Sequence, residues 1–155
     1  MKKVLVMILV VVTAYACGNQ NGGSPAKVPG SEAAANDNPS YDPQRGEGKF
    51  TKVEVAATID TKLLESGTKV YTVKCSACHK LTAEKLVGPG WTGVTKRHTA
   101  EWIMNFVTNT DAMLNKDPKA QALLEICLVR MPNQNVSDDD ARGIYEFMRK
   151  NDGVK

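Results

Sequence analysis

The chain is poor in aromatic residues and cysteines and has no long basic run, and each shortage excludes something. Aromatic residues make up 6% of 155 residues, so a large core would need another source of bulk. Four cysteines are too few for a disulfide-stabilised scaffold of this length. No basic run exceeds two residues and the formal net charge is +3, which gives no support for nucleic-acid binding. The remaining composition, 42% hydrophobic and 24% charged, is that of a globular protein.

The first segment has the pattern of an export signal. Two lysines precede an apolar run, residues 4–12, that is too short to span a bilayer. Ala14 and Ala16 then place small residues at the positions that a signal peptidase reads. We therefore expect residues 1–16 to be a signal peptide and the mature protein to lie on the periplasmic side of a bacterial membrane.

Cys17 follows this cleavage point directly, an arrangement that resembles a bacterial lipoprotein signal. The resemblance implies lipidation of Cys17 and anchoring to a membrane, although Ala14 stands where that family usually has leucine. Ordinary cleavage, which would leave a soluble periplasmic protein, is the alternative.

The next segment has the composition of a linker. Residues 18–50 are rich in Gly, Pro, Ser, Asn and Asp and lack apolar periodicity, which predicts a flexible chain. We thus expect residues 17–50 to form a lipidated N-terminus and linker, and residues 51–155 to form the folded domain. Phe50, Val53 and Val55 alternate with polar residues, as in a short strand.

Helical periodicity dominates from about residue 57 to 152 and predicts an all-α domain. Apolar residues recur at three- and four-residue steps after Ile59, ending at Cys75. Thr99, Asp117 and Ser137 are expected to cap three further helices. Ala122, Leu123, Ile126 and Cys127 are the expected inner stripe of the helix that begins at Asp117.

The run Cys75-Ser76-Ala77-Cys78-His79 is C-x-x-C-H, the attachment signature of c-type haem. Residues three and four apart share a helix face, so both cysteines can reach one haem edge and His79 can lie beneath the iron. Covalent haem c would also supply the bulk that the aromatic content lacks. A redox dithiol needs a βαβ context that is not visible, and a zinc site would need His98 and Cys127 at irregular spacing.

With this motif the chain resembles the class I cytochrome c family over roughly residues 60–150. Gly67, Tyr71 and Cys75 are similar to the family's N-terminal helix, where glycine permits close crossing by the C-terminal helix at Ile144 and Phe147. Gly88-Pro89 follows the haem histidine at the family's distance. The resemblance implies that the Pro89 carbonyl accepts a hydrogen bond from His79 and that Met131 is the sixth ligand.

The residues themselves leave several candidates for that sixth ligand. Met104 and Met148 lie on expected helix stripes and are most simply core residues. Met113 and Met131 lie in loop-like sequence, and only Met131 is followed by proline, which stiffens the loop. We expect His79/Met131 ligation, with Met113 and then His98 as alternatives. Cys127 is expected to be a small buried hydrophobe rather than a redox-active thiol.

These patterns predict a one-electron carrier, not an enzyme, that acts as a monomer in a periplasmic respiratory chain. It would shuttle between a respiratory donor complex and a terminal oxidase or reductase. The alternative is a haem sensor or small-molecule-binding haem protein in which the Met131 bond opens. Basic residues near the haem-binding segments would form either a docking rim for an acidic partner or an ordinary solvated surface: Lys74, Lys80, Lys85, Lys96, Arg97 and Arg130.

Overall fold

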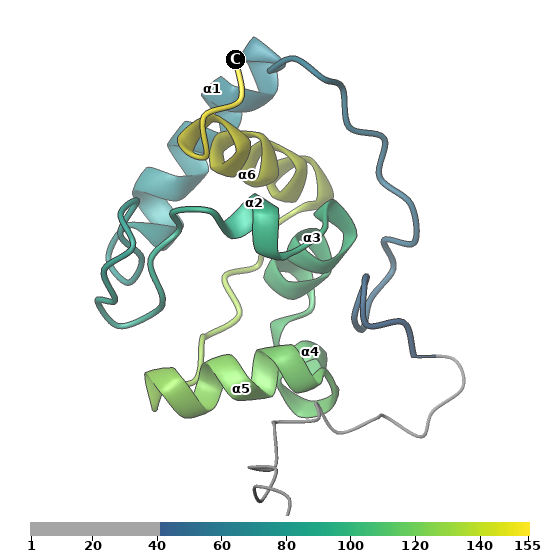
Figure 1. Ribbon diagram of the computed structural model, residues 1–155, viewed down its shortest axis with the longest axis vertical. Helices are drawn as coiled ribbons and strands as arrows, with labels where there is room; N and C mark the ends of the chain where they lie inside the picture. The colour runs from purple at the N-terminus through teal and green to yellow at the C-terminus, as the bar shows by residue number, and fades with distance from the viewer. Residues whose placement is uncertain (1–40) are drawn as a thin grey trace, which may run out of the picture. The chain divides into compact units, whose positions relative to one another are not determined.

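The computed structural model describes residues 41–155, so the expected signal peptide, Cys17 and most of the expected linker lie outside the described residues. All regular elements of the described part are helical, which confirms the all-α prediction (Figure 1). They are α1 (Thr61–Val70), the π-helix η1 (Tyr71–Cys75), α2 (Val94–Arg97), α3 (Ala100–Thr108), α4 (Thr110–Lys116), α5 (Pro118–Cys127) and α6 (Asp138–Asn151). No helix in 41–155 is long and apolar enough to cross a bilayer.

The expected capping residues begin the helices as predicted. The Thr99 side chain accepts a hydrogen bond from the Trp102 N–H at the start of α3. Asp117 accepts from the Ala120 N–H, and Pro118 occupies the first turn of α5. Side-chain oxygens at these positions satisfy backbone donors that have no partner within the helix.

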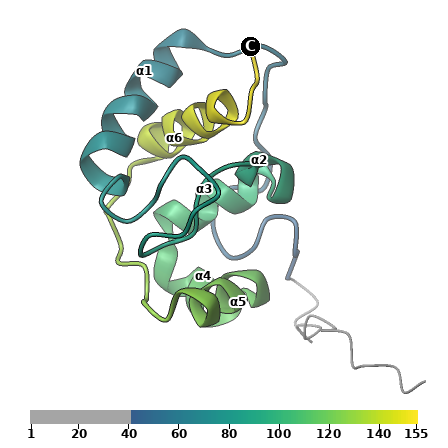
Figure 2. The same ribbon diagram turned by 60° about the vertical axis from the view of Figure 1, so that its left-hand side comes forward.

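Helices α1 and α6 cross at two glycines, and this contact organises the domain (Figures 1 and 2). A Cβ atom added to Gly67 would lie 2.0 Å from the Gly143 carbonyl oxygen, so no side chain fits between the helices. Phe147 of α6 stacks on Tyr71 of η1 with ring centroids 4.9 Å apart. The crossing predicted at Gly67 is confirmed, and it packs α1 against α6, with Cys75 following at the end of η1.

A buried ion cluster also joins α6 to the segment before α1. The Glu146 carboxylate is fully buried and lies 2.8 Å from Arg149 Nη1 and 2.9 Å from Arg142 Nη1. It also accepts a hydrogen bond from the Asp60 N–H at 2.9 Å. Both carboxylate oxygens therefore have donors, as a buried charge requires.

The expected strand at Phe50, Val53 and Val55 does not form; residues 50–55 carry no strand pairing. The Phe50 N–H donates to Asn105 Oδ1 at 2.9 Å, and the Val53 N–H donates to Glu101 Oε1 at 2.7 Å. The alternating pattern was therefore misleading because the partner of this segment is the side-chain surface of α3, not another strand.

Residues 41–50 were predicted as the end of the linker, but they are attached to the domain. We call Tyr41–Phe50 the N-terminal arm. Asn105, fully buried in α3, donates to the Arg45 carbonyl at 2.9 Å and to the Phe50 carbonyl at 3.0 Å. The arm is held mainly by hydrogen bonds to its backbone groups, and such contacts leave no apolar periodicity in the sequence. Composition alone therefore assigned residues 41–50 to the linker and not to the domain.

Candidate haem-binding site

The C-x-x-C-H motif lies at the turn that follows η1. The Cys78 and His79 N–H groups donate to the Cys75 carbonyl at 3.1 and 2.9 Å, which keeps the three residues on one turn. Neither cysteine is joined to another cysteine in a disulfide. Burial raises the pKa of Cys75 to about 11, against the opposing effect of Lys74. Cys78 lines the cavity described below, whereas Cys75 does not, and its Sγ lies 4.0 Å from the Val70 carbonyl oxygen.

His79 is held in one orientation and in the neutral form. Its Nδ1 lies 2.9 Å from the Pro89 carbonyl oxygen, and because a carbonyl only accepts, Nδ1 carries the proton. Burial lowers the pKa of His79, and the bond to Pro89 opposes this shift. A neutral imidazole with Nδ1 as donor keeps the Nε2 lone pair available for a metal.

Gly88 explains how the chain passes so close to this ring. A Cβ atom at Gly88 would lie 2.3 Å from His79 Cε1, so any side chain would push the ring away. Tyr71 supports the same turn by donating from its hydroxyl to the His79 carbonyl at 2.9 Å. Gly88 and Pro89 together fix where the imidazole points.

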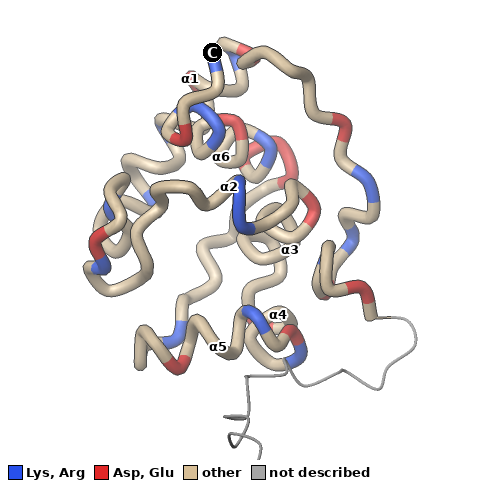
Figure 3. Tube along the Cα trace, in the orientation of Figure 1, with Lys and Arg blue, Asp and Glu red and all other residues tan. Residues whose placement is uncertain are grey.

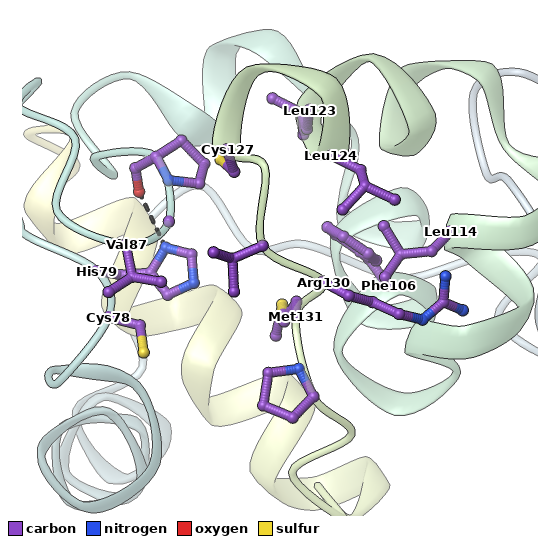
Figure 4. Close-up of a pocket in the computed structure, with 14 residues that line it drawn as sticks. Cys78, His79, Val87, Phe106, Leu114, Leu123, Leu124, Cys127, Arg130 and Met131 are labelled. Carbon is purple, nitrogen blue, oxygen red and sulfur yellow. Dashed lines mark hydrogen bonds between the residues drawn. The ribbon is translucent and has the colours of Figure 1, made fainter.

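His79 and Met131 line one apolar cavity of about 340 Å³ (Figure 4). Its walls come from the turn after η1, from α3, α4 and α5, and from the Met131 loop, residues 128–137, which connects α5 to α6. The lining residues beyond the two named above are mostly apolar and include Val87, Phe106, Leu114, Leu123, Leu124 and Val129.

A smaller cavity of about 90 Å³ shares His79, Pro89 and Met131 with the first and has a polar end at Arg97 and His98. The His98 ring stacks on Trp102 at 4.0 Å between centroids. Its Nδ1 is buried and is the one such side-chain atom in residues 41–155 without a hydrogen-bond partner. Burial, with Lys119 and Arg97 nearby, lowers the pKa of His98 to about 4.

These residues fit a haem. The cavity walls are apolar, as a porphyrin requires, and His79 and Met131 offer the imidazole and thioether that haem iron takes. Haem also carries two carboxylates, and the unpartnered His98 Nδ1 and the Arg97 guanidinium supply polar groups for an anion in an otherwise apolar space. A zinc site is not assembled: the described residues contain no group of three or more His, Cys, Asp or Glu placed to hold a metal ion.

The other methionines and His98 are placed differently from Met131. Met113 is fully buried, and its Sδ accepts a hydrogen bond from the Glu47 N–H at 3.0 Å, so it faces the N-terminal arm. Met104 lies in the buried core. Met148 and His98 line only the smaller cavity, whereas Met131 lines both.

Helix α5 is rotated relative to the expected inner stripe. Leu123, Leu124 and Cys127 line the cavity, whereas Ala122 and Ile126 are exposed. Cys127 is partly buried and lines the cavity, so it faces the cofactor space rather than the protein core. The error has a physical cause: α5 packs against a cofactor space rather than a protein core, and its apolar residues cover more than one face. The sequence pattern also did not identify Leu114 of α4 and Leu124 of α5 as cavity-lining residues, because both face the cofactor space.

Known proteins are similar to this chain in sequence and in fold. The family model described as cytochrome c matches residues 64–152. A cytochrome c from Rhodothermus marinus is similar in structure, with 30% identity and a TM-score of 0.65 over 68% of this chain and 90% of that one. An engineered form of that cytochrome gives the same values, and its complex with a carbene intermediate gives a TM-score of 0.62 at the same identity and coverage.

No curated protein matches the chain. The family match, the similar structures and the C-x-x-C-H turn beside an apolar cavity agree on one assignment. The chain belongs to the cytochrome c family and is a haem-binding electron carrier with one covalently bound haem c.

Proposed function

We propose that this protein is an exported, monomeric one-electron carrier of a periplasmic respiratory chain, with haem attached to Cys75 and Cys78 and ligated by His79 and Met131. The observation that carries the proposal is that His79 and Met131, far apart in sequence, line the same apolar cavity. When bound, the haem iron changes between Fe(II) and Fe(III) and so moves one electron.

The chain's contribution is to hold both ligands still in each oxidation state. Pro89 orients His79 through the Nδ1–H bond and makes the imidazole a better donor. Pro132 stiffens the backbone directly after Met131. A methionine thioether together with the histidine would raise the reduction potential of the bound haem and would leave no coordination position for an added ligand. These features favour electron transfer over activation of a small molecule.

The proposed docking surface for redox partners is the rim of the cavity. Val87 and Val129 line the cavity and are exposed, and Leu128, 84% exposed, directly precedes Val129. Leu128 adopts a left-handed backbone conformation with φ of 61°, which is costly for a leucine. This conformation is that of the α5 C-cap, where the Leu128 N–H donates to the Leu124 carbonyl, and it leaves the leucine side chain as exposed apolar surface that a partner could contact.

The cations near this rim are less available than the sequence suggested. Arg130 pairs with Asp111 at 3.1 Å, and Lys80 pairs with Glu84 at 2.7 Å. Lys85 donates to the Ile126 carbonyl at 3.0 Å. Acidic and basic residues are interspersed along most of the described chain, apart from the acidic run Asp138–Asp140 at the start of α6 (Figure 3). We therefore propose partners with an apolar surface around their own redox centre, and electron transfer that depends only moderately on ionic strength.

Spectroscopy of the purified protein tests the proposal. A reversible reduced-minus-oxidised haem spectrum, with a red to near-infrared charge-transfer band of methionine ligation in the oxidised form, is expected. A coloured band should remain after denaturing electrophoresis because the haem is covalent. A five-coordinate spectrum with rapid uptake of nitric oxide or peroxide would instead support the sensor or ligand-binding function.

A further inference from the structure

The N-terminal arm, Tyr41–Phe50, is attached to α4, which forms one wall of the haem cavity. The Glu47 N–H donates to Met113 Sδ at 3.0 Å, and Asn109 Nδ2 donates to the Glu47 carbonyl at 3.3 Å. Both Met113 and the neighbouring Thr110 are fully buried. The arm therefore covers the face of α4 that points away from the cavity, while Leu114 on the same helix lines the cavity.

The arm is also attached to the start of α5 through a buried carboxylate. Asp117 is fully buried and accepts hydrogen bonds from the Tyr41 hydroxyl, from Trp102 Nε1 at 3.1 Å and from the Ala120 N–H at 2.8 Å. Burial and the Asp117 carboxylate both raise the pKa of Tyr41, so its hydroxyl stays protonated and remains a donor. Loss of the arm would leave this buried carboxylate with one donor fewer, which is costly.

The residue before Met131 is attached to α4 from the other side. The Arg130 Nη2 atom donates to Asp111 Oδ1 at 3.1 Å and to Asn115 Oδ1 at 3.0 Å. Arg130, Met131 and Leu114 all line the larger cavity. Helix α4 thus lies between the arm and the Met131 loop and is hydrogen-bonded to both.

We propose that the N-terminal arm is a clasp that positions the Met131 loop: by fixing α4 it keeps residues 128–132 closed over the haem. The arm touches no haem ligand, so its residues act through α4 and Arg130. The proposal rests on the proposed function only for the identity of Met131 as iron ligand. Its consequence is that releasing the arm opens α4 and the loop locally, before the domain unfolds.

Two glycine substitutions separate this effect from backbone strain. Gly46 has φ of +64°, and a Cβ atom there would lie 2.6 Å from Met113 Sδ and Cε. Gly153 has φ of +96°, and its Cβ atom would meet nothing within 4 Å. Gly46→Ala and Gly153→Ala both force alanine into a left-handed conformation. Only Gly46→Ala also brings a Cβ atom against the buried Met113 side chain of α4, so the packing of the arm on α4 must change.

The measurement is amide hydrogen exchange of the holoprotein, followed residue by residue. In Gly46→Ala we expect the amides of α4 and of Leu128 to exchange roughly tenfold faster than in Gly153→Ala, with α1 and α6 unchanged. Binding of imidazole to the oxidised protein should accelerate by a similar factor, because imidazole enters when the loop opens. If only the arm's own amides exchange faster, the arm is passive and the proposal is overturned.

The same data distinguish failure of the clasp proposal from failure of the assignment of Met131 as the iron ligand. Faster exchange of α4 and Leu128 without faster imidazole binding would support the clasp and contradict Met131 as the ligand. Should Gly46→Ala fail to fold, Tyr41→Phe is the milder test, because it removes only the hydroxyl that donates to Asp117. Equal exchange of α4 in Tyr41→Phe and in the exposed control Lys52→Ala, which removes an exposed pair with Glu54, would overturn the proposal.

Discussion

Gly67 and Gly143 bring the backbones of α1 and α6 into direct contact: a Cβ atom on Gly67 would lie 2.0 Å from the Gly143 oxygen and 2.4 Å from its carbonyl carbon. The obstacle is backbone on both sides, so no rotamer change can relieve it. The contact sets the position of η1, which follows α1, and therefore the position of the C-x-x-C-H turn. A helix crossing remote from the cavity thus determines where the haem cysteines lie.

Gly67→Ala should destabilise the holoprotein by about 3 kcal/mol, at the upper end of overpacking in a filled core. In an isolated helix, replacing glycine with alanine would stabilise the helix by ~1 kcal/mol. A loss of stability in Gly67→Ala must therefore come from the helix crossing. Chemical denaturation followed by haem absorption measures it. Thr68→Ala, on the exposed side of α1, is the matched control and should change stability little. Equal stability of both variants would contradict the close crossing.

The sequence predicted this crossing but not its partner residue. Gly67 was identified because Gly67, Tyr71 and Cys75 resemble the N-terminal helix of the cytochrome c family, and the same resemblance placed Ile144 and Phe147 opposite it. The atoms nearest to Gly67 belong to Gly143, with the Ile144 nitrogen next. A glycine inside a long amphipathic helix was the available signal, because such a position is unfavourable unless a backbone must approach.

Glu146→Ala should destabilise the protein by about 3–5 kcal/mol, because Arg149, almost fully buried, would lose its carboxylate partner. Glu146→Gln should cost less, since the amide oxygen can still accept from the Asp60 N–H. Urea unfolding measures both. The control is Glu65→Ala, which removes an exposed pair with Lys69 and should leave the unfolding midpoint near that of the wild type. A small effect of Glu146→Ala would show that Arg149 finds other acceptors.

Met131→Ala should abolish the charge-transfer band of methionine ligation, lower the reduction potential and open the iron to exogenous ligands. Met113→Leu should keep the band, because the Met113 thioether accepts a hydrogen bond from the arm and does not line the cavity. Near-infrared absorption and potentiometry of both variants decide the assignment. Loss of the band in Met113→Leu alone would reverse it.

Cys127→Ala should retain the haem, the potential and the electron-transfer rate. Cys127 ends α5 and lines the cavity, where its side chain supplies apolar surface. Truncation to alanine should therefore lower thermal stability only modestly. Haem staining, potentiometry and stopped-flow reduction compare the variant with the wild type. A large shift in potential, or loss of activity on mild oxidation of the wild type only, would instead identify a redox-active thiol.

The parts that the sequence did not predict share one cause: contacts without apolar periodicity. The arm is attached through the Glu47 backbone and the Asn105 amide, and neither leaves a hydrophobic pattern. The sequence also did not predict which face of α5 points inward. The haem space is lined by apolar residues on several faces of the helix, so the periodicity did not single out one face. By contrast, His79 and Pro89 were predicted because the motif and the family resemblance fix their spacing, and the structure places them 2.9 Å apart.

The last prediction concerns Cys17, which lies outside the described residues. We propose that it is lipidated and that residues 18–40 form the tether that their composition predicts. A flexible chain of that length spans about 25 Å, which would let the haem domain reach neighbouring membrane complexes at a raised effective concentration. Multiple acylation would be needed for stable anchoring. Cys17→Ser in the native host should move haem staining from the membrane to the soluble periplasmic fraction or to unprocessed precursor. Wild-type protein that is already released by osmotic shock would show that Ala14 and Ala16 mark an ordinary cleavage site and that no lipid anchor exists.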